Sequence, residues 1–171
     1  MELGLLIVRV VVGALLVGHG SQKLFGWFGG YGLKGTGGYM ESFGLRPGPL
    51  FALTAGAAEL TGGLLFGTGL LTPLAAAMVA STMLVSARTD HAGKGLWIFN
   101  GGAEYVLTNA AVVIGVAFAG AGEWSLDNAI GWDVSGTWWG IGASAAAVLG
   151  AGSVLALRQL GVASRTQAVA A

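Results

Sequence analysis

Three ionisable residues lie within long apolar stretches of the sequence, where a charge is costly. Arg9 follows an aliphatic run near the N-terminus, and Glu59 and Glu104 interrupt two later apolar stretches. On insertion scales, a charged side chain at the centre of a membrane-spanning helix costs about 2.5–3.5 kcal/mol. Such residues normally face the interior of a helix bundle and pair there. We therefore predict an ion pair between Arg9 and Glu59.

One arginine facing two carboxyl groups leaves one carboxyl group without a counter-charge. In a site of low dielectric constant, the pKa of that group rises and the group stays protonated. It could then exchange protons with a reducible ligand such as a quinone. The alternative is that the charged residues only fix helix packing, because a buried ion pair is weak evidence of any other role.

The polar residues near these three extend the predicted ligand site. The further candidates are His19, Gln22, Lys23 and Asn109. We expect His19 to hydrogen-bond near Gln22 and Glu104, and Lys23 to extend toward the membrane surface. His19 and His91 are conceivable haem ligands, but one ends a helix and the other lies in a loop. The chain has no cysteine, which excludes thiolate ligands, and we predict no metal site.

The elements that must position these residues are membrane-spanning helices. Apolar residues make up 54% of the 171 residues and charged residues 9%, whereas soluble domains carry roughly 25% charged residues. A span needs about 20 helical residues. The sequence predicts an all-α, polytopic membrane protein with spans at residues 3–20, 49–71, 73–87, 96–119 and 137–157. The break between the second and third spans is a tight turn around Gly69.

Small residues recur at helical spacing beside the charged ones. The predicted inward faces are Arg9, Gly13, Leu16, Gly20 and Lys23 in the first span, Ala55, Glu59, Gly63 and Gly67 in the second, and Glu104, Thr108, Ala111 and Gly115 in the fourth. Small side chains let membrane helices approach closely. We therefore expect close helix packing around each charged residue.

Aromatic and basic residues indicate how the chain lies in a bilayer. All six tryptophans fall at span ends or in loops, as in an aromatic belt. Lys23, Lys34, Arg46, Arg88, Lys94, Arg158 and Arg165 all fall on one side of a five-span arrangement. The positive-inside rule makes that side cytoplasmic, so we predict an external N-terminus and a cytoplasmic C-terminus. The net charge is zero and no basic stripe is present, so nucleic acid is not an expected partner.

The loop between the first two spans, residues 21–48, is rich in glycine and aromatic residues. Tyr39, Met40 and Phe43 could share one face of a short helix that ends near Gly44. One interpretation is a helix lying on the membrane surface. The other is a lid over a pocket in the bundle.

The order of these features resembles the DoxX family of small bacterial integral membrane proteins. The segments that carry the resemblance are Arg9, HGSQKLFG (19–26), KGTGGYMESFGL (34–45), AELTGGLLFGTGLLTPLAA (58–76), GGAEY (101–105) and GAGEWSLD (120–127). Each segment is weak by itself, but six in order over residues 1–130 are specific. The resemblance implies a DoxX-like four-helix membrane domain at residues 1–133. An additional transmembrane helix at 134–158 and a cytoplasmic tail at 159–171 would follow.

The resemblance also implies a location in the bacterial inner membrane and an association with quinone-linked or oxidative-stress redox systems. The sequence contains no self-contained catalytic motif, so whether it is an enzyme stays open. Our hypothesis is an accessory or anchoring subunit that binds a quinone, with a redox protein or a second copy of the chain as candidate partners. The alternatives are a transporter for a small solute and a purely structural membrane anchor.

Overall fold

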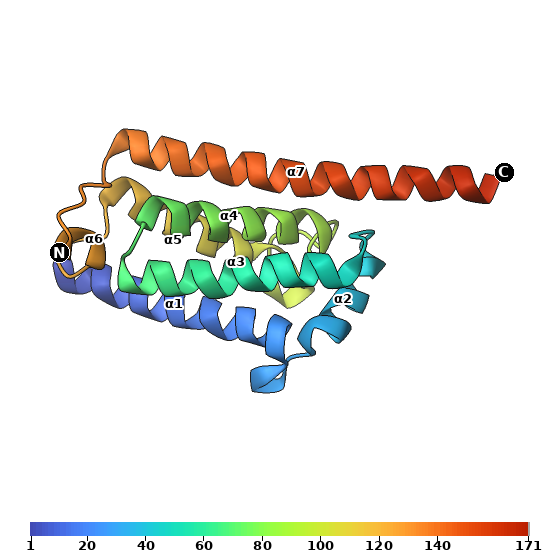
Figure 1. The fold of residues 1–171 in the computed structure, drawn as a ribbon, viewed down its shortest axis with the longest axis horizontal. Coiled ribbons are helices and arrows are strands. Elements are labelled where there is room, and N and C mark those ends of the chain that lie inside the picture. The colour runs from blue at the N-terminus through green and yellow to red at the C-terminus, as the bar shows by residue number, and fades with distance from the viewer. Residues whose placement is uncertain (171) are drawn as a thin grey trace.

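The computed structural model describes the backbone of residues 1–170 and the side chains of residues 1–160, and this part of the chain is helical with no strand. The helices are α1 (Glu2–Phe25), α2 (Gly32–Ser42), α3 (Gly48–Thr68), α4 (Thr72–Thr89), α5 (Glu104–Ala119), α6 (Leu126–Ala129) and α7 (Thr137–Ala170), with 3₁₀ turns η1 (Trp27–Gly29) and η2 (Ile98–Asn100). The five long helices lie along one axis, and α2 covers one end of the bundle (Figure 1). This confirms the all-α prediction.

Length and composition single out three helices that could cross a membrane: α1, α3 and residues 137–160 of α7. Helix α5 is apolar but shorter, and α4 does not meet the same criterion. Helix α4 packs against α3, α5 and α7, and eight of its residues are buried. Because neighbouring helices cover much of α4, its alanine, serine and threonine side chains do not need to be strongly apolar. The arrangement of four core spans and one additional span stays a prediction.

The predicted start of the fourth span, at residue 96, was wrong. Helix α5 begins only at Glu104, after the turn η2. Gly95 and Gly101 both adopt positive φ angles, which glycine reaches without steric cost. The chain turns at these glycines, so the helix begins about two helical turns later than predicted. At the other end of the chain, α7 runs through residue 158 without a break, and the side chains of residues 161–171, Arg165 included, lie outside the described part.

Helices α1 and α3 are in backbone contact along most of their length. A Cβ atom added to Gly13 would lie 2.7 Å from the Gly63 carbonyl oxygen, and one added to Gly20 would lie 2.5 Å from the Leu60 backbone nitrogen. Real Cβ atoms do not come that close, so only glycine fits at these positions. Small residues therefore allow α1 and α3 to approach closely, as the sequence predicted.

The predicted inward faces of the first and second spans are largely confirmed, but the predicted inward face of the fourth span was wrong. Arg9, Gly13, Leu16 and Gly20 are all buried in α1, and Glu59 and Gly63 are buried in α3. On α5, however, Thr108, Ala111 and Gly115 are exposed. The buried face of α5 contains Val106, Asn109, Val113, Val116 and Ala117 instead. Helix α5 packs on α4 through an apolar interface that requires no close backbone approach. Its buried face can therefore carry larger side chains.

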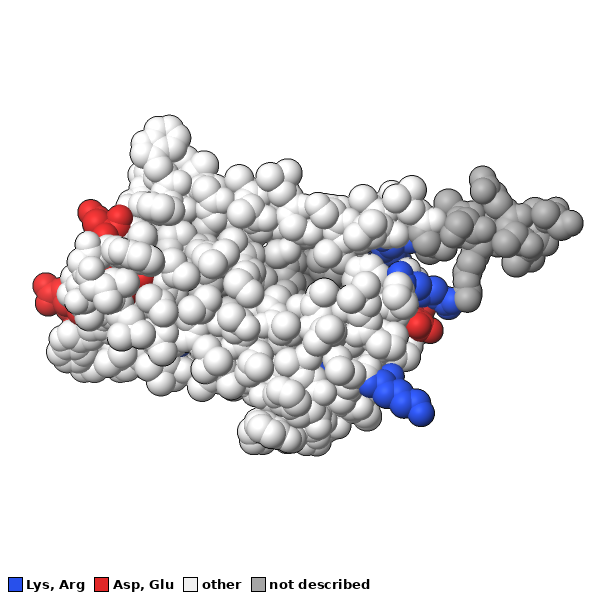
Figure 2. Space-filling view, in the orientation of Figure 1, with Lys and Arg blue, Asp and Glu red and all other residues white. Residues whose placement is uncertain are grey.

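The two ends of the bundle differ in charge. We call the end that contains α2 the basic end and the end that contains α6 the acidic end. Figure 2 shows Lys and Arg side chains at the basic end and Asp and Glu side chains gathered at the acidic end. At the acidic end, the Asp127 carboxylate accepts hydrogen bonds from the backbone N–H groups of Leu71 (2.7 Å) and Thr72 (3.0 Å) and from the Thr72 hydroxyl (2.7 Å). Asp127 therefore caps the N-terminus of α4, where a negative charge is favourable.

Replacement of Gly20 by alanine tests the α1–α3 contact, with Gly18→Ala as the matched control. A Cβ at Gly18 meets no atom within 4 Å. We expect Gly20→Ala to destabilise the protein by about 1–3 kcal/mol, since the helices must separate. We expect Gly18→Ala to leave stability unchanged or to raise it slightly, because alanine favours helix. Thermal unfolding in detergent measures both, and equal midpoints for the two variants would contradict the contact.

Candidate functional site

A cavity of about 390 Å³ lies at the basic end of the bundle. Helices α1, α2, α3, α4 and α5 all contribute to its wall. Four of the predicted site residues line it: His19, Gln22, Lys23 and Glu59. A volume of this size is typical of small-molecule sites, which are mostly apolar with a few placed polar groups.

The main polar feature of the cavity is an ion pair between α1 and α3. Lys23 Nζ lies 2.5 Å from Glu59 Oε2, and the side chains are 25% and 5% exposed, respectively. The expectation that Lys23 extends toward the membrane surface was therefore wrong. The close α1–α3 contact at Gly20 brings the last turn of α1 against the middle of α3, so the ammonium group finds a carboxylate inside the bundle. This pairing offsets the cost of placing both charges there.

The predicted Arg9–Glu59 pair was wrong, because the two residues lie at different depths. Arg9 is level with Gly69, ten residues beyond Glu59, which is about 15 Å of helix rise. Its Nη2 donates a hydrogen bond to the Trp124 carbonyl oxygen at 2.5 Å. Among the described residues, its Nε and Nη1 are buried without a hydrogen-bond partner. The carboxylates close enough to interact with Arg9 electrostatically are those of Asp127 and Glu2.

Glu104 and Asn109 also lie apart from the cavity lining. Glu104 sits at the N-terminus of α5, where its Oε2 accepts a hydrogen bond from the Ile98 backbone N–H at 3.0 Å. Asn109 is buried, but its Nδ2 donates to the Tyr105 carbonyl oxygen one helical turn earlier. The three predicted charged residues therefore do not form one cluster, and the reasoning that left one carboxyl group without a counter-charge does not apply to this site.

A histidine of α1 and a tyrosine of α5 form another part of the cavity wall. His19 Nε2 lies 3.3 Å from the Tyr105 hydroxyl, and the two rings are 5.9 Å apart. Tyr105 was not predicted as a site residue, although it directly follows Glu104 in GGAEY. Gln22 donates from Nε2 to the Phe28 carbonyl oxygen at 3.1 Å, which stabilises the turn η1. The Gln22 side chain also lines the cavity.

Helix α2 forms the roof of the cavity through Thr36, Tyr39, Met40 and Phe43. Tyr39, Met40 and Phe43 share one face, as predicted, and this face belongs to the cavity wall. The Glu41 carboxylate accepts a hydrogen bond from the Gly48 backbone N–H at 2.9 Å. This bond fastens α2 to the start of α3.

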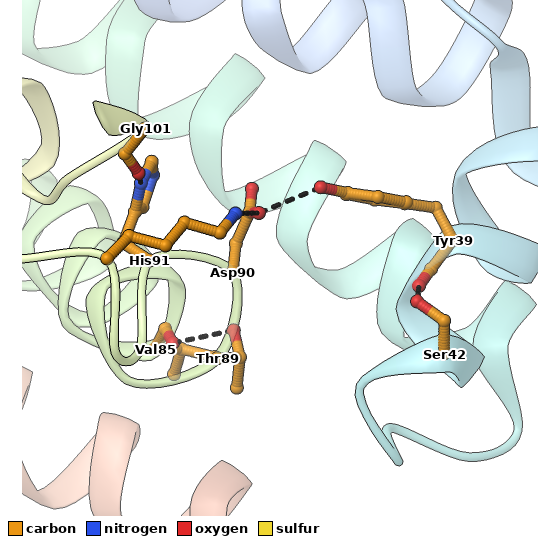
Figure 3. A network of polar contacts seen from close by, with 8 residues as sticks. Tyr39, Ser42, Val85, Thr89, Asp90, His91 and Gly101 are labelled. Atoms are coloured by element: carbon orange, nitrogen blue, oxygen red, sulfur yellow. Dashed lines mark hydrogen bonds and ion pairs between the residues drawn. The ribbon is translucent and has the colours of Figure 1, made fainter. Parts of the chain in front are cut away.

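A second attachment joins the roof to the end of α4 (Figure 3). The Tyr39 hydroxyl donates to Asp90 Oδ1 at 2.8 Å, and Lys94 Nζ lies 3.3 Å from the same oxygen. Loss of hydration and then the hydrogen bond to Asp90 raise the pKa of Tyr39 to about 12, so the hydroxyl stays a donor at neutral pH. Neighbouring His91 donates from Nδ1 to the Gly101 carbonyl oxygen at 2.6 Å. Periodicity within one helix could not have identified the Tyr39–Asp90 bond, whose residues are 51 positions apart.

The cavity combines hydrogen-bond donors, the carboxylates of Glu59 and Asp90, and apolar walls. An ammonium group has three donors, and the bond to Glu59 uses one of those of Lys23. Met83, Val106 and Phe43 supply apolar surface. Within the described residues, no group of three or more His, Asp or Glu side chains is placed to hold a metal ion. The arrangement suits a mostly apolar molecule with hydrogen-bond acceptors.

Comparison with known proteins places the chain in a family. The sequence model of the DoxX family matches residues 4–92, which is just over half of the chain and includes α1 to α4. The comparisons with curated proteins and with solved structures gave no match. The matched segment includes Lys23, Glu59, Tyr39 and Asp90. The chain therefore belongs to the DoxX family.

Proposed function

We propose that this membrane protein binds a quinone-type molecule in the cavity at the basic end. We further propose that it serves as an accessory or anchoring subunit of a membrane redox system. The observation that carries the proposal is the Lys23–Glu59 ion pair, which lies inside the bundle and yet lines a cavity large enough for a ligand.

The groups around the cavity match the head group of a quinone. A quinone ring is flat and apolar on both faces, and its two carbonyl oxygens accept hydrogen bonds. Lys23 and Tyr105 can donate to such oxygens from different walls. Glu59 and His19 are ionisable groups beside them. Because the cavity interior has a low dielectric constant, each of these polar contacts is stronger than it would be in water.

The same ion pair could act only as a fastener between α1 and α3. A pair that only fixes packing needs no cavity beside it. Lys23 is one quarter exposed, and the space that it faces is bounded by side chains from four other helices. This geometry favours a ligand site over a purely structural role.

The packing beyond Glu59 supports binding rather than passage of a solute. On the acidic side of the ion pair, Leu16 and Phe66 are 1% and 0% exposed. Gly13 and Gly63 there hold α1 and α3 in backbone contact. A transport path along this interface would have to open the backbone contact between α1 and α3.

The proposed subunit lies in the bacterial inner membrane with its basic end in the cytoplasm. The support is the concentration of Lys and Arg at that end, which the positive-inside rule places on the cytoplasmic side. In this orientation the cavity opens toward the cytoplasm, where a peripheral redox partner could reach the bound head group. The redox association itself rests on the family resemblance.

Exchange of Glu59 for glutamine tests the proposal, and Glu104→Gln is a matched control outside the cavity. We expect protein purified in native lipid to retain extractable quinone, and a soluble short-chain quinone to bind it. Glu59→Gln should weaken that binding roughly tenfold or more, because a neutral glutamine no longer holds the Lys23 ammonium group in place to donate to the ligand. Glu104→Gln should bind normally. Extraction with chromatography, and titration with the short-chain quinone, measure these effects.

A double variant separates ligand binding from folding. Glu59→Gln leaves the Lys23 ammonium without its partner, which is destabilising, whereas replacing both members of a buried pair by apolar residues is often tolerated. We therefore expect Lys23→Met combined with Glu59→Met to fold and to lose quinone. A wild-type protein without quinone, and unable to bind added quinone, would overturn the proposed function. Normal binding by the double variant would do the same.

A further inference from the structure

A second hollow, of about 420 Å³, runs between α3, α4 and α7. Its floor is one stripe of α4 from Leu74 to Val85 at helical spacing, a distance of about 16 Å along the helix. Small residues form much of its sides, with Ala58 on α3 and with Ala146 and Gly150 on α7. We call this hollow the groove. The space-filling view shows the surface hollowed between α7 and the rest of the bundle (Figure 2).

The groove adjoins the cavity of the proposed quinone head group. The two hollows share Met40, Leu45, Ala55, Thr82 and Val85 as lining residues. The cavity carries the ion pair and the hydrogen-bond donors, whereas the groove is lined almost entirely by apolar groups. The two adjoining hollows are therefore polar at the basic end and apolar along the middle of the bundle.

The groove is closed toward the basic end and accessible from the side of the bundle. Arg158 on α7 donates from Nε to the Phe43 carbonyl oxygen at 2.5 Å. This bond joins α7 to the end of α2 and closes the gap between them. The sides of the groove are helices α3 and α7, both of which are long and apolar enough to cross a membrane. In the proposed membrane arrangement, its open side faces lipid.

We propose that the groove holds the apolar isoprenoid tail of the quinone, and that the ligand enters the site laterally from the bilayer. This inference rests on the proposed function and names its substrate class as a long-tailed quinone. A lipid acyl chain could fill the groove, but it would bring no flat head group to Lys23 and Glu59. A ligand with a polar ring and an apolar chain fits both parts at once.

A quinone that carries a photoreactive diazirine on its tail tests the location of the chain. In nanodiscs, illumination should attach the probe to peptides of α3, α4 and α7 that line the groove. An excess of unlabelled long-tailed quinone should suppress the labelling, and so should the Lys23→Met, Glu59→Met double variant. Labelling that is confined to the exposed faces of α1 and α5 would overturn the inference.

Two adjacent alanines provide a matched pair of variants. Ala145 and Ala146 are both exposed on α7, and only Ala146 lines the groove. We expect Ala146→Leu to reduce groove labelling about tenfold, because the added side chain occupies the space of the tail. Ala145→Leu should leave labelling unchanged. Ala58→Leu, on the opposite side of the groove, should reproduce the effect of Ala146→Leu. This second variant excludes the explanation that Ala146→Leu acts only by distorting α7.

Titration with a short-chain quinone distinguishes failure of this inference from failure of the proposed function. We expect wild type and Ala146→Leu to bind the short-chain quinone equally. If Ala146→Leu and Ala145→Leu label equally while the short-chain quinone still binds, the groove assignment is wrong and the head-group site stands. If wild type binds no quinone of either length, both proposals fail.

Discussion

The backbone contact between α1 and α3 determines how the rest of the molecule is arranged. Gly13 and Gly20 on α1 meet Gly63 and Leu60 on α3 at distances that leave no room for a side chain. Since this contact fixes how far one helix can slide along the other, it also decides which charged residues meet. It places Lys23 against Glu59 at 2.5 Å, and it holds Arg9 at the level of the turn between α3 and α4.

The contact between α1 and α3 places the cations Arg9 and Lys23 in two different environments. Arg9 is fully buried and bonds to the Trp124 carbonyl oxygen, so it holds the chain that follows α5 against the acidic end. Lys23 is partly exposed to a cavity. A charge enclosed on all sides has no room for a ligand, whereas a charge at a cavity wall can exchange one of its contacts for a ligand atom. The chemistry of the protein is therefore expected beside Lys23.

Periodicity in the sequence predicted the helices and the inward faces of α1 and α3, because burial and close packing leave a repeat in a single segment. Lys23 and Glu59 lie on these periodic faces, whereas His19 and Gln22 were chosen as polar residues near them, and all four line one cavity. Periodicity did not predict the partners. Which charges meet depends on the offset between two helices, and no repeat within one helix records that offset. Glu104 was assigned to the interior because the glycine turns before it were interpreted as helix.

In the proposed function, the cavity and the adjoining groove give the protein a way to serve a membrane redox system. A long-tailed quinone diffuses in the bilayer, while a peripheral partner stays at the surface, so electron exchange requires the head group to be held near one end. In the proposed arrangement, the groove between α3, α4 and α7 admits the tail from lipid. The cavity then holds the ring beside Lys23 and Glu59, beneath α2. Because α2 is fastened to α4 by the Tyr39–Asp90 bond, the roof of the cavity is the part of the protein through which a partner at the basic end would affect the bound quinone.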